Sequence, residues 1–200
     1  MNRMEKLIEA FRKFPSVGPK QAERFAMYVM RADPSEINSL IEAVINAKNE
    51  IKFCKKCNNY SAEDFCDICS DLKRDSATIC VVENPFDIIA IEKTKSYNGV
   101  YYVIGSYIIP HYENNTFLSR MDKLIQRVKE EKITEVIIAL NTTTEGQATA
   151  LYIKKNISDY VNKVSRIAFG VPMGADIDYI DEYTLGYALK GRTPITDRDF

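Results

Sequence analysis

The chain has 200 residues, of which 46% are hydrophobic and 28% are charged, and its formal net charge is −1. This composition is typical of a globular protein with one or two modest domains, and the net charge by itself does not indicate a nucleic-acid partner. No apolar run approaches the roughly 18 residues of a membrane span. A signal peptide needs an uninterrupted apolar stretch near its start, whereas the charged residues Glu5, Lys6 and Glu9 interrupt the apolar residues here. We therefore expect a cytoplasmic protein without a membrane partner.

The first 50 residues predict helices. Apolar residues recur at helical spacing over 4–11 and again over 22–29, and the tight turn "FPSVGPK" (14–20) joins the two segments. This short connection predicts a helical hairpin, with Pro19 in the first turn of its second helix. Asp33 and Glu36 predict a capping box that opens a third helix. The apolar residues of that helix are Ile37, Leu40, Ile41, Val44 and Ile45.

The hairpin carries basic residues. Residues 1–56 hold 11 Lys and Arg against 7 Asp and Glu, a balance of +4, whereas the remaining residues hold 16 against 21, a balance of −5. Lys20 and Arg24 lie four positions apart, on the face of the second helix opposite its apolar stripe. Such a helix start can hold a DNA phosphate without reading sequence. The other interpretation, a plain helical hairpin with solvated basic residues, stays open at this point.

The cysteines predict a metal site. Cys54 and Cys57 form one C-x-x-C pair, and Cys66 and Cys69 form a second pair, with eight residues between the two pairs. Two such pairs complete a tetrahedral zinc site with no open position, so the zinc would be structural. A redox C-x-x-C is the alternative, but redox motifs occur singly. Cys80 lies inside an apolar strand and is interpreted as a small buried residue.

Beyond the cysteines, strands and helices alternate. The apolar strands are nearly continuous, which predicts a small parallel sheet covered by helices on both faces. Pro85 opens the first of these helices, and a last helix is expected over 181–190. The predicted strands are 78–82, 101–105, 135–140 and 166–170.

Two glutamates follow predicted strands, where α/β proteins build their sites. Glu83 follows the first strand, and Glu145 follows the third strand in a turn that resembles the D-x-D-x-E-G pattern of Toprim domains. Asn141 and Thr143 stand where that family has its two aspartates. Because neither carries charge, we expect no Mg²⁺ clamp here and interpret the turn as a degenerate Toprim site.

The order of the parts resembles the RecR family of bacterial recombination mediators. The resemblance runs from about Leu7 to Arg192 and rests on the four cysteines and on "VGPK", "CVVENPFDI", "TEG", "ATA", "GVP" and "TLGYALKGR". It implies an α/β fold in several parts. These are an N-terminal helix-hairpin-helix bundle (1–53), a four-cysteine zinc knuckle (54–72), a parallel Toprim-like sheet with flanking helices (76–171) and a C-terminal oligomerisation tail (172–200).

The resemblance also implies a function without catalysis. Members form homotetrameric rings around DNA and act with RecO, and with RecF, to load the RecA recombinase on single-stranded gaps during repair. Lys20 and Arg24 fall where the family contacts DNA. This chain departs from the pattern at Ser16, usually a glycine, at the loop 109–113, and at Thr142 and Gln147. The alternatives are a metal-dependent Toprim nuclease or primase, and an interaction scaffold that does not contact DNA.

Overall fold

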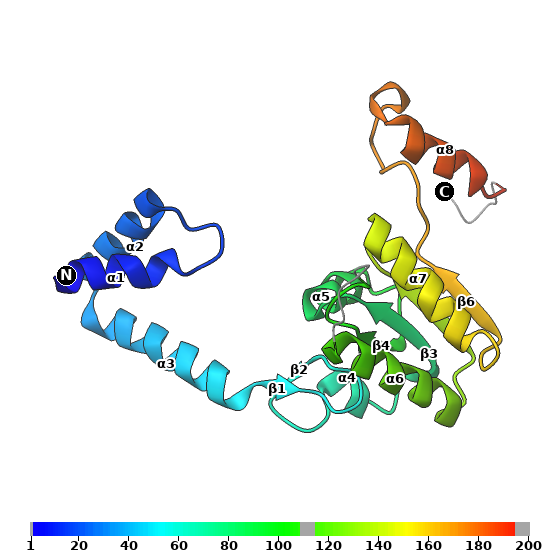
Figure 1. The fold of residues 1–200 in the computed structure, drawn as a ribbon, viewed down its shortest axis with the longest axis horizontal. Helices are drawn as coiled ribbons and strands as arrows, with labels where there is room; N and C mark the ends of the chain where they lie inside the picture. The colour runs from blue at the N-terminus through cyan, green and yellow to red at the C-terminus, as the bar shows by residue number, and fades with distance from the viewer. Residues whose placement is uncertain (1, 109–114, 195–200) are drawn as a thin grey trace. The chain divides into compact units, whose positions relative to one another are not determined.

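The structure is a computed structural model that describes residues 2–108 and 115–194 (Figure 1). The divergent loop 109–113 lies outside these described residues. The chain divides into two compact units, Met1–Lys52 and Phe53–Phe200. Within the described ranges, no helix is both long and apolar enough to cross a membrane.

The first unit contains the predicted helical hairpin. Helix α1 (Arg3–Arg12) begins at a capping box between Asn2 and Glu5, and α2 (Pro19–Arg31) begins with Pro19 in its first turn. The two helices pack through small and aromatic residues. Ala22 and Ala26 are fully buried, and the rings of Phe11 and Phe25 meet edge to face at 5.6 Å.

Helix α3 (Pro34–Glu50) follows, but the predicted capping box at its start is wrong. Asp33 occupies the N-cap position, yet its side chain accepts no capping hydrogen bond. Glu36 instead accepts a hydrogen bond from the hydroxyl group of Tyr28 on α2, so its carboxylate is engaged between helices. The apolar face of α3 is largely exposed within the unit: Leu40 53%, Ile41 49%, Val44 60% and Ile45 50%.

Ser16 holds the turn between α1 and α2 in a left-handed conformation, with φ of 65°. A side chain is disfavoured there, so Ser16→Gly should raise the free energy of unfolding of this unit by about 1 kcal/mol. Urea unfolding followed by far-ultraviolet circular dichroism measures the change. As a control, Ser39→Gly inside α3 should lower the same free energy by about 0.5 kcal/mol. A decrease for Ser16→Gly would contradict the strained turn.

The second unit is built on a parallel sheet, as predicted. Within the described residues its strand order is β4-β3-β5-β6, and Val82 lies opposite both Val103 and Ala139. The strands are β3 (Asp75–Val82), β4 (Gly99–Val103), β5 (Glu135–Ala139) and β6 (Lys163–Arg166). The helices between them are α5 (Pro85–Thr94), α6 (Asn115–Glu130) and α7 (Thr144–Ile157).

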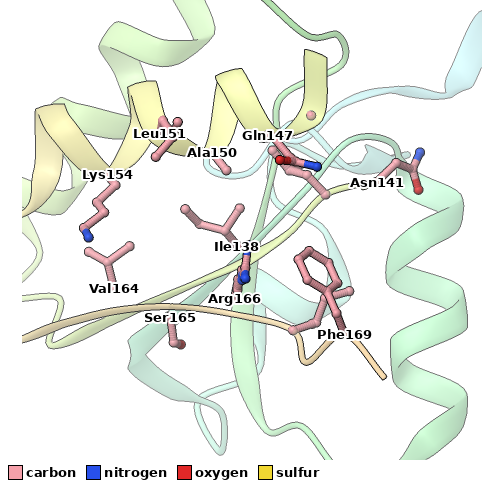
Figure 2. Close-up of a pocket in the computed structure, with 13 residues that line it drawn as sticks. Ile138, Asn141, Gln147, Ala150, Leu151, Lys154, Val164, Ser165, Arg166 and Phe169 are labelled. Atoms are coloured by element: carbon pink, nitrogen blue, oxygen red, sulfur yellow. The ribbon is translucent and has the colours of Figure 1, made fainter. Parts of the chain in front are cut away.

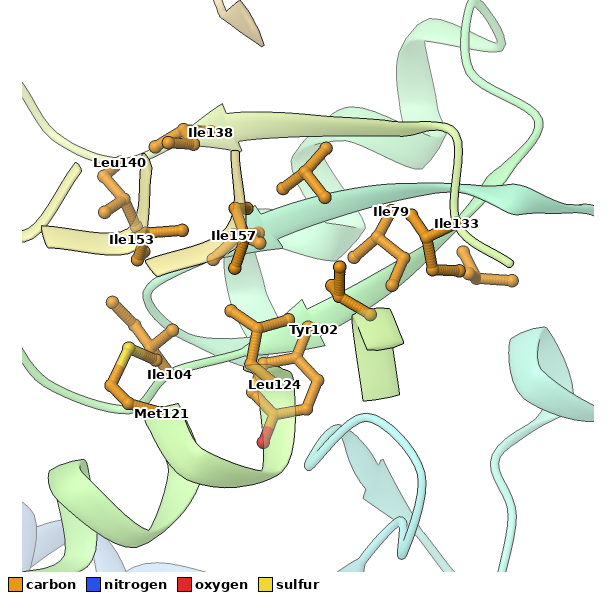
Figure 3. Packing of buried hydrophobic residues seen from close by; sticks show 14 of the residues in the cluster. Ile79, Tyr102, Ile104, Met121, Leu124, Ile133, Ile138, Leu140, Ile153 and Ile157 are labelled. Carbon is orange, nitrogen blue, oxygen red and sulfur yellow. The ribbon is translucent and has the colours of Figure 1, made fainter. Parts of the chain in front are cut away.

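Alternate residues of the central strand β3 enter two different cores, because successive side chains point to opposite faces of a sheet. Ile79 and Val81 pack with α6 and α7, as Figure 3 shows for part of this cluster. Cys80 and Val82 pack on the other face against α5. Both faces are therefore covered, which explains why the strand is apolar throughout.

The last predicted strand, 166–170, is wrong. The strand β6 ends at Arg166, where the prediction placed its start, and it pairs only with β5 at the edge of the sheet. An edge strand is half exposed, so Lys163 and Ser165 are tolerated and no apolar run marks it. The chain then leaves the sheet towards the short turn η1 (Ile177–Tyr179) and helix α8 (Glu182–Lys190).

Candidate functional sites

The basic residues of the hairpin lie at the start of α2. Gly18 is its N-cap and offers no capping side chain, so the first N–H groups of the helix stay available. Lys20 and Arg24 are exposed, and neither forms an ion pair with another described residue. Available N–H groups and two unpaired cations suit a phosphate.

Arg24 also lines an open groove of about 680 Å³ together with aromatic residues of the first unit. Phe14 and Tyr28 are among these lining residues and are 59% and 54% exposed. This placement modifies the expectation that both cations lie opposite the apolar stripe, because the stem of Arg24 lies beside apolar rings. A long side chain can cover such a surface and still keep its charged end in water.

The four cysteines converge on one point. Their sulfur atoms all lie within 4.8 Å of one another, and the Sγ atoms of Cys57 and Cys66 are 3.6 Å apart. A tetrahedral zinc with bonds of about 2.3 Å would place its sulfur ligands about 3.8 Å apart. The backbone N–H of Cys66 also donates to Sγ of Cys54 at 3.3 Å. The donor set therefore fits zinc, whereas Cys80 lies outside the cluster and is 3% exposed.

The crowding of the thiols shows why the cluster suits a cation. A hydrogen bond to the sulfur of Cys66 raises the pKa of Cys57, and burial raises it further. The same bond lowers the pKa of Cys66, whose sulfur accepts it. Neighbouring thiols thus share protons that a dication would displace. Zinc affinity should accordingly decrease as the pH falls, since protons compete for the sulfurs.

Hydrogen bonds fix the cysteine knuckle to the edge strand β4. The backbone N–H of Val103 donates to the carbonyl of Cys57 at 2.8 Å. The buried Arg127 of α6 donates from Nη1 to the carbonyls of Lys56, at 3.2 Å, and Tyr101, at 3.1 Å. The metal site and the sheet are thus parts of one packed structure.

The carboxyl ends of β3 and β5 lie at one edge of the sheet, here called the strand-end edge, and two of the predicted residues meet there. Glu83 follows β3 and Asn141 follows the neighbouring β5, and the Asn141 Nδ2 group donates to Oε2 of Glu83 at 2.9 Å. The hydroxyl group of Tyr107 donates to the same oxygen at 2.6 Å. Burial, followed by this bond to Glu83, raises the pKa of Tyr107 to about 12, so the hydroxyl remains a donor at neutral pH. The Glu83 carboxylate is therefore held by neutral donors.

The other two residues of the predicted degenerate site begin helix α7. Thr143 is its N-cap, and the hydroxyl oxygen accepts a hydrogen bond from the N–H of Gly146 at 3.1 Å. Glu145 is exposed in the first turn, where the helix dipole favours an acid. In the described part of the chain, the only group of three or more metal-ligating side chains is the cysteine cluster. Asp176 and Asp178, two acids between β6 and α8, are exposed and join no such group.

Known protein families match this chain in the same order as its parts. Family models match the chain as a RecR helix-hairpin-helix (4–48), a RecR four-cysteine zinc finger domain (51–71), a Toprim domain (77–168) and a RecR C-terminal region (170–193). The recombination protein RecR of Synechococcus elongatus is 42% identical over 96% of both chains. Those of Bifidobacterium adolescentis and Prochlorococcus marinus are 41% identical over 96% of both chains.

The chain belongs to the RecR family. Membership implies a role in recombinational DNA repair. The RecR zinc-finger match spans all four clustered cysteines, which agrees with structural Zn²⁺ at that site. The Toprim match spans both the strand-end edge and the turn after β5.

A pocket of about 350 Å³ adjoins this edge in the RecR-family fold, between α7 and the strands β5 and β6 (Figure 2). Asn141 and Gln147 line it near the edge, Lys154 and Arg166 contribute cations, and most of the remaining lining is apolar. Sequence reasoning missed this pocket because the predicted strand 166–170 would have placed part of the lining inside the sheet. Tyr107 was also missed, since nothing in the sequence marks a loop tyrosine as the partner of Glu83.

Gly146 permits the turn that positions Asn141. A Cβ atom at Gly146 would lie 2.0 Å from the backbone oxygen of Asn141, so Gly146→Ala must displace the start of α7. We expect the free energy of unfolding to fall by about 1–3 kcal/mol in a denaturant titration. Gly186→Ala in α8 is the matched control, because its Cβ meets open space and should stabilise by about 0.5–1 kcal/mol. Equal effects would show that the close approach is unimportant.

Proposed function

We propose that this chain is a non-catalytic mediator of recombinational DNA repair that holds DNA through its basic hairpin. The observation that carries the proposal is the hydrogen bonding of Glu83 at the strand-end edge. Phosphoryl transfer on nucleic acid with Mg²⁺ needs several carboxylate ligands at such an edge. Here Asn141 presents an N–H donor to Glu83 in place of a second carboxylate, and Tyr107 occupies the same oxygen.

The hairpin supplies the contact with DNA. Lys20 and Arg24 add positive charge beside the uncapped N–H groups of α2, which suits phosphates and carries no sequence information. Binding would therefore be independent of sequence and sensitive to salt. Few phosphates need be held by each subunit if several subunits act together, because linked sites raise the effective concentration.

The proposal also includes association of several copies of this chain. The family resemblance implies a homotetrameric ring, and the exposed apolar side chains Leu40, Ile41, Val44 and Ile45 on α3 support an oligomer of some kind. We further propose that the assembled protein acts with RecO, and with RecF, to load RecA on single-stranded gaps. These partners follow from the family resemblance alone.

Restoring the missing acids tests the proposed loss of the metal clamp. Isothermal titration with Mn²⁺ should show binding for Asn141→Asp/Thr143→Asp that wild type lacks, because two added carboxylates would join Glu83. Asn38→Asp/Thr184→Asp adds the same charge elsewhere and should behave like wild type. Mn²⁺ binding by wild type that Glu83→Gln abolishes would instead support a metal-dependent Toprim enzyme.

A further inference from the structure

Three side chains of the second unit form a column on the cysteine knuckle. The rings of Phe53 in β1 (Lys52–Phe53) and Tyr60 in β2 (Tyr60–Ser61) stack with centroids 5.6 Å apart and planes 22° apart. The guanidinium group of Arg120 on α6 lies over the Phe53 ring, 5.1 Å from its centroid. Phe53 thus contacts both Arg120 and Tyr60.

The backbone around the column fixes its aromatic residues and its arginine. Phe53 immediately precedes the zinc ligand Cys54, whose N–H donates to the carbonyl of Asn59 beside Tyr60 at 2.7 Å. Arg120 passes close to Gly105, where a Cβ atom would lie 1.8 Å from its Nη1 atom. Because Gly105 follows β4 at the strand-end edge, the column extends from the knuckle towards that edge. A preformed column loses little conformational entropy when it binds a ligand.

The exposure and charge of the column indicate what it could bind. Phe53 is 52% exposed and Tyr60 is 50% exposed, so large aromatic surfaces remain open to solvent. No carboxylate among the described residues pairs with the Arg120 guanidinium. Asp64, an acid of the same cysteine knuckle, is paired with Lys55 at 2.6 Å. The column therefore combines open aromatic surface with a positive charge that no described carboxylate pairs with, which is the chemistry of single-strand binding sites.

We propose that the column is a stacking platform for a base of single-stranded DNA, with the base on Tyr60 and the neighbouring backbone attracted by Arg120. This proposal rests on the proposed function as a DNA-holding mediator. It adds that the cysteine knuckle recognises single-stranded rather than duplex DNA. Bases in a duplex are already stacked and paired, so only an unpaired base can lie on an aromatic side chain. The knuckle then contacts the gap itself, whereas the hairpin holds phosphates of either form.

Affinity measurements separate these two contacts. Tyr60→Leu should weaken binding to labelled oligothymidine by roughly 5- to 100-fold, because each stacked base contributes appreciably, and leave binding to fully paired duplex unchanged. Tyr60→Phe keeps the ring and should retain the affinity of wild type. Zinc content and thermal unfolding confirm that each variant is folded. Unchanged oligothymidine binding by Tyr60→Leu, with binding still weakened in Lys20→Ala/Arg24→Ala, would overturn the platform and leave the proposed function standing.

A fluorescent reporter tests contact directly. The chain has no tryptophan, so Tyr60→Trp introduces a single one, and a stacked thymine should quench its emission. Tyr160→Trp is the matched control, since Tyr160 is 47% exposed and has Lys129 Nζ 4.5 Å from its ring centroid but stacks on no other described ring. Quenching at position 60 alone, saturating with oligothymidine, supports the platform. Equal quenching at both positions, or quenching by duplex at position 60, would overturn it. Failure of every variant and of wild type to bind any DNA would overturn the proposed function as well.

Discussion

Lys20→Ala/Arg24→Ala should lower the affinity for a fluorescently labelled gapped DNA by on the order of 10- to 100-fold at low salt. Both side chains are exposed beside the uncapped start of α2, so their removal takes away two cations without disturbing a core. The dependence of log affinity on log salt should also become shallower by about 0.7 to 0.9 for each phosphate that is no longer neutralised. Fluorescence anisotropy measures both quantities.

The charge change itself requires a control. Lys93→Ala/Lys155→Ala removes the same charge from exposed positions on α5 and α7, and it should leave the affinity nearly unchanged. Equal decreases for the two double variants would show that binding follows net charge rather than the hairpin. An unchanged affinity and salt dependence for Lys20→Ala/Arg24→Ala would favour the scaffold interpretation.

Cys69→Ala should abolish binding of the single zinc ion and lower the free energy of unfolding of the second unit by on the order of 5 kcal/mol or more. Four sulfurs within 4.8 Å of one another form the site, and the segment around them is too small for a core of its own. Because the N–H of Val103 donates to the carbonyl of Cys57, the amide hydrogen of Val103 should also exchange faster. Zinc analysis, denaturant titration and hydrogen exchange measure the three effects.

Cys80→Ala is the matched control for that experiment. Cys80 is buried in β3 and lies outside the cluster, so this variant should retain zinc and lose only the packing of one sulfur atom. Retention of zinc by Cys69→Ala, with unchanged exchange at Val103, would mean that three cysteines suffice. Loss of zinc from Cys80→Ala would mean that the site depends on the whole sheet.

The sequence predicted those elements that are marked by a short motif or by a repeated apolar pattern. The cysteine spacing predicted which four cysteines cluster, since two C-x-x-C pairs constrain the site without knowledge of the fold. Helix α2 and strand β3 were found because their apolar patterns span most of their length. The position of Asn141, Thr143 and Glu145 after a strand was predicted from their register, and their role as a degenerate site stays a prediction.

Sequence failed where a residue's partner is remote along the chain or where an element is half exposed. Strand β6 was misplaced because only Val164 of its four residues is apolar, so no apolar run marks it at the sheet edge. Glu36 was assigned to a capping box, whereas its partner is Tyr28 on another helix. Tyr107 meets Glu83 across 24 positions. Arg120 reaches Phe53 from a different element, and no pattern along the chain reports such contacts.

Incubation of the wild-type protein with labelled gapped DNA and Mg²⁺ or Mn²⁺ at low salt tests the central claim most directly. Anisotropy is followed over time, and the DNA is then resolved by denaturing electrophoresis. Because Glu83 is held by neutral donors and the Toprim aspartates are absent, anisotropy should rise to a stable plateau and the DNA should stay intact. A rise that decays while shorter DNA fragments appear, and that Glu83→Gln prevents, would contradict a non-catalytic DNA-holding mediator.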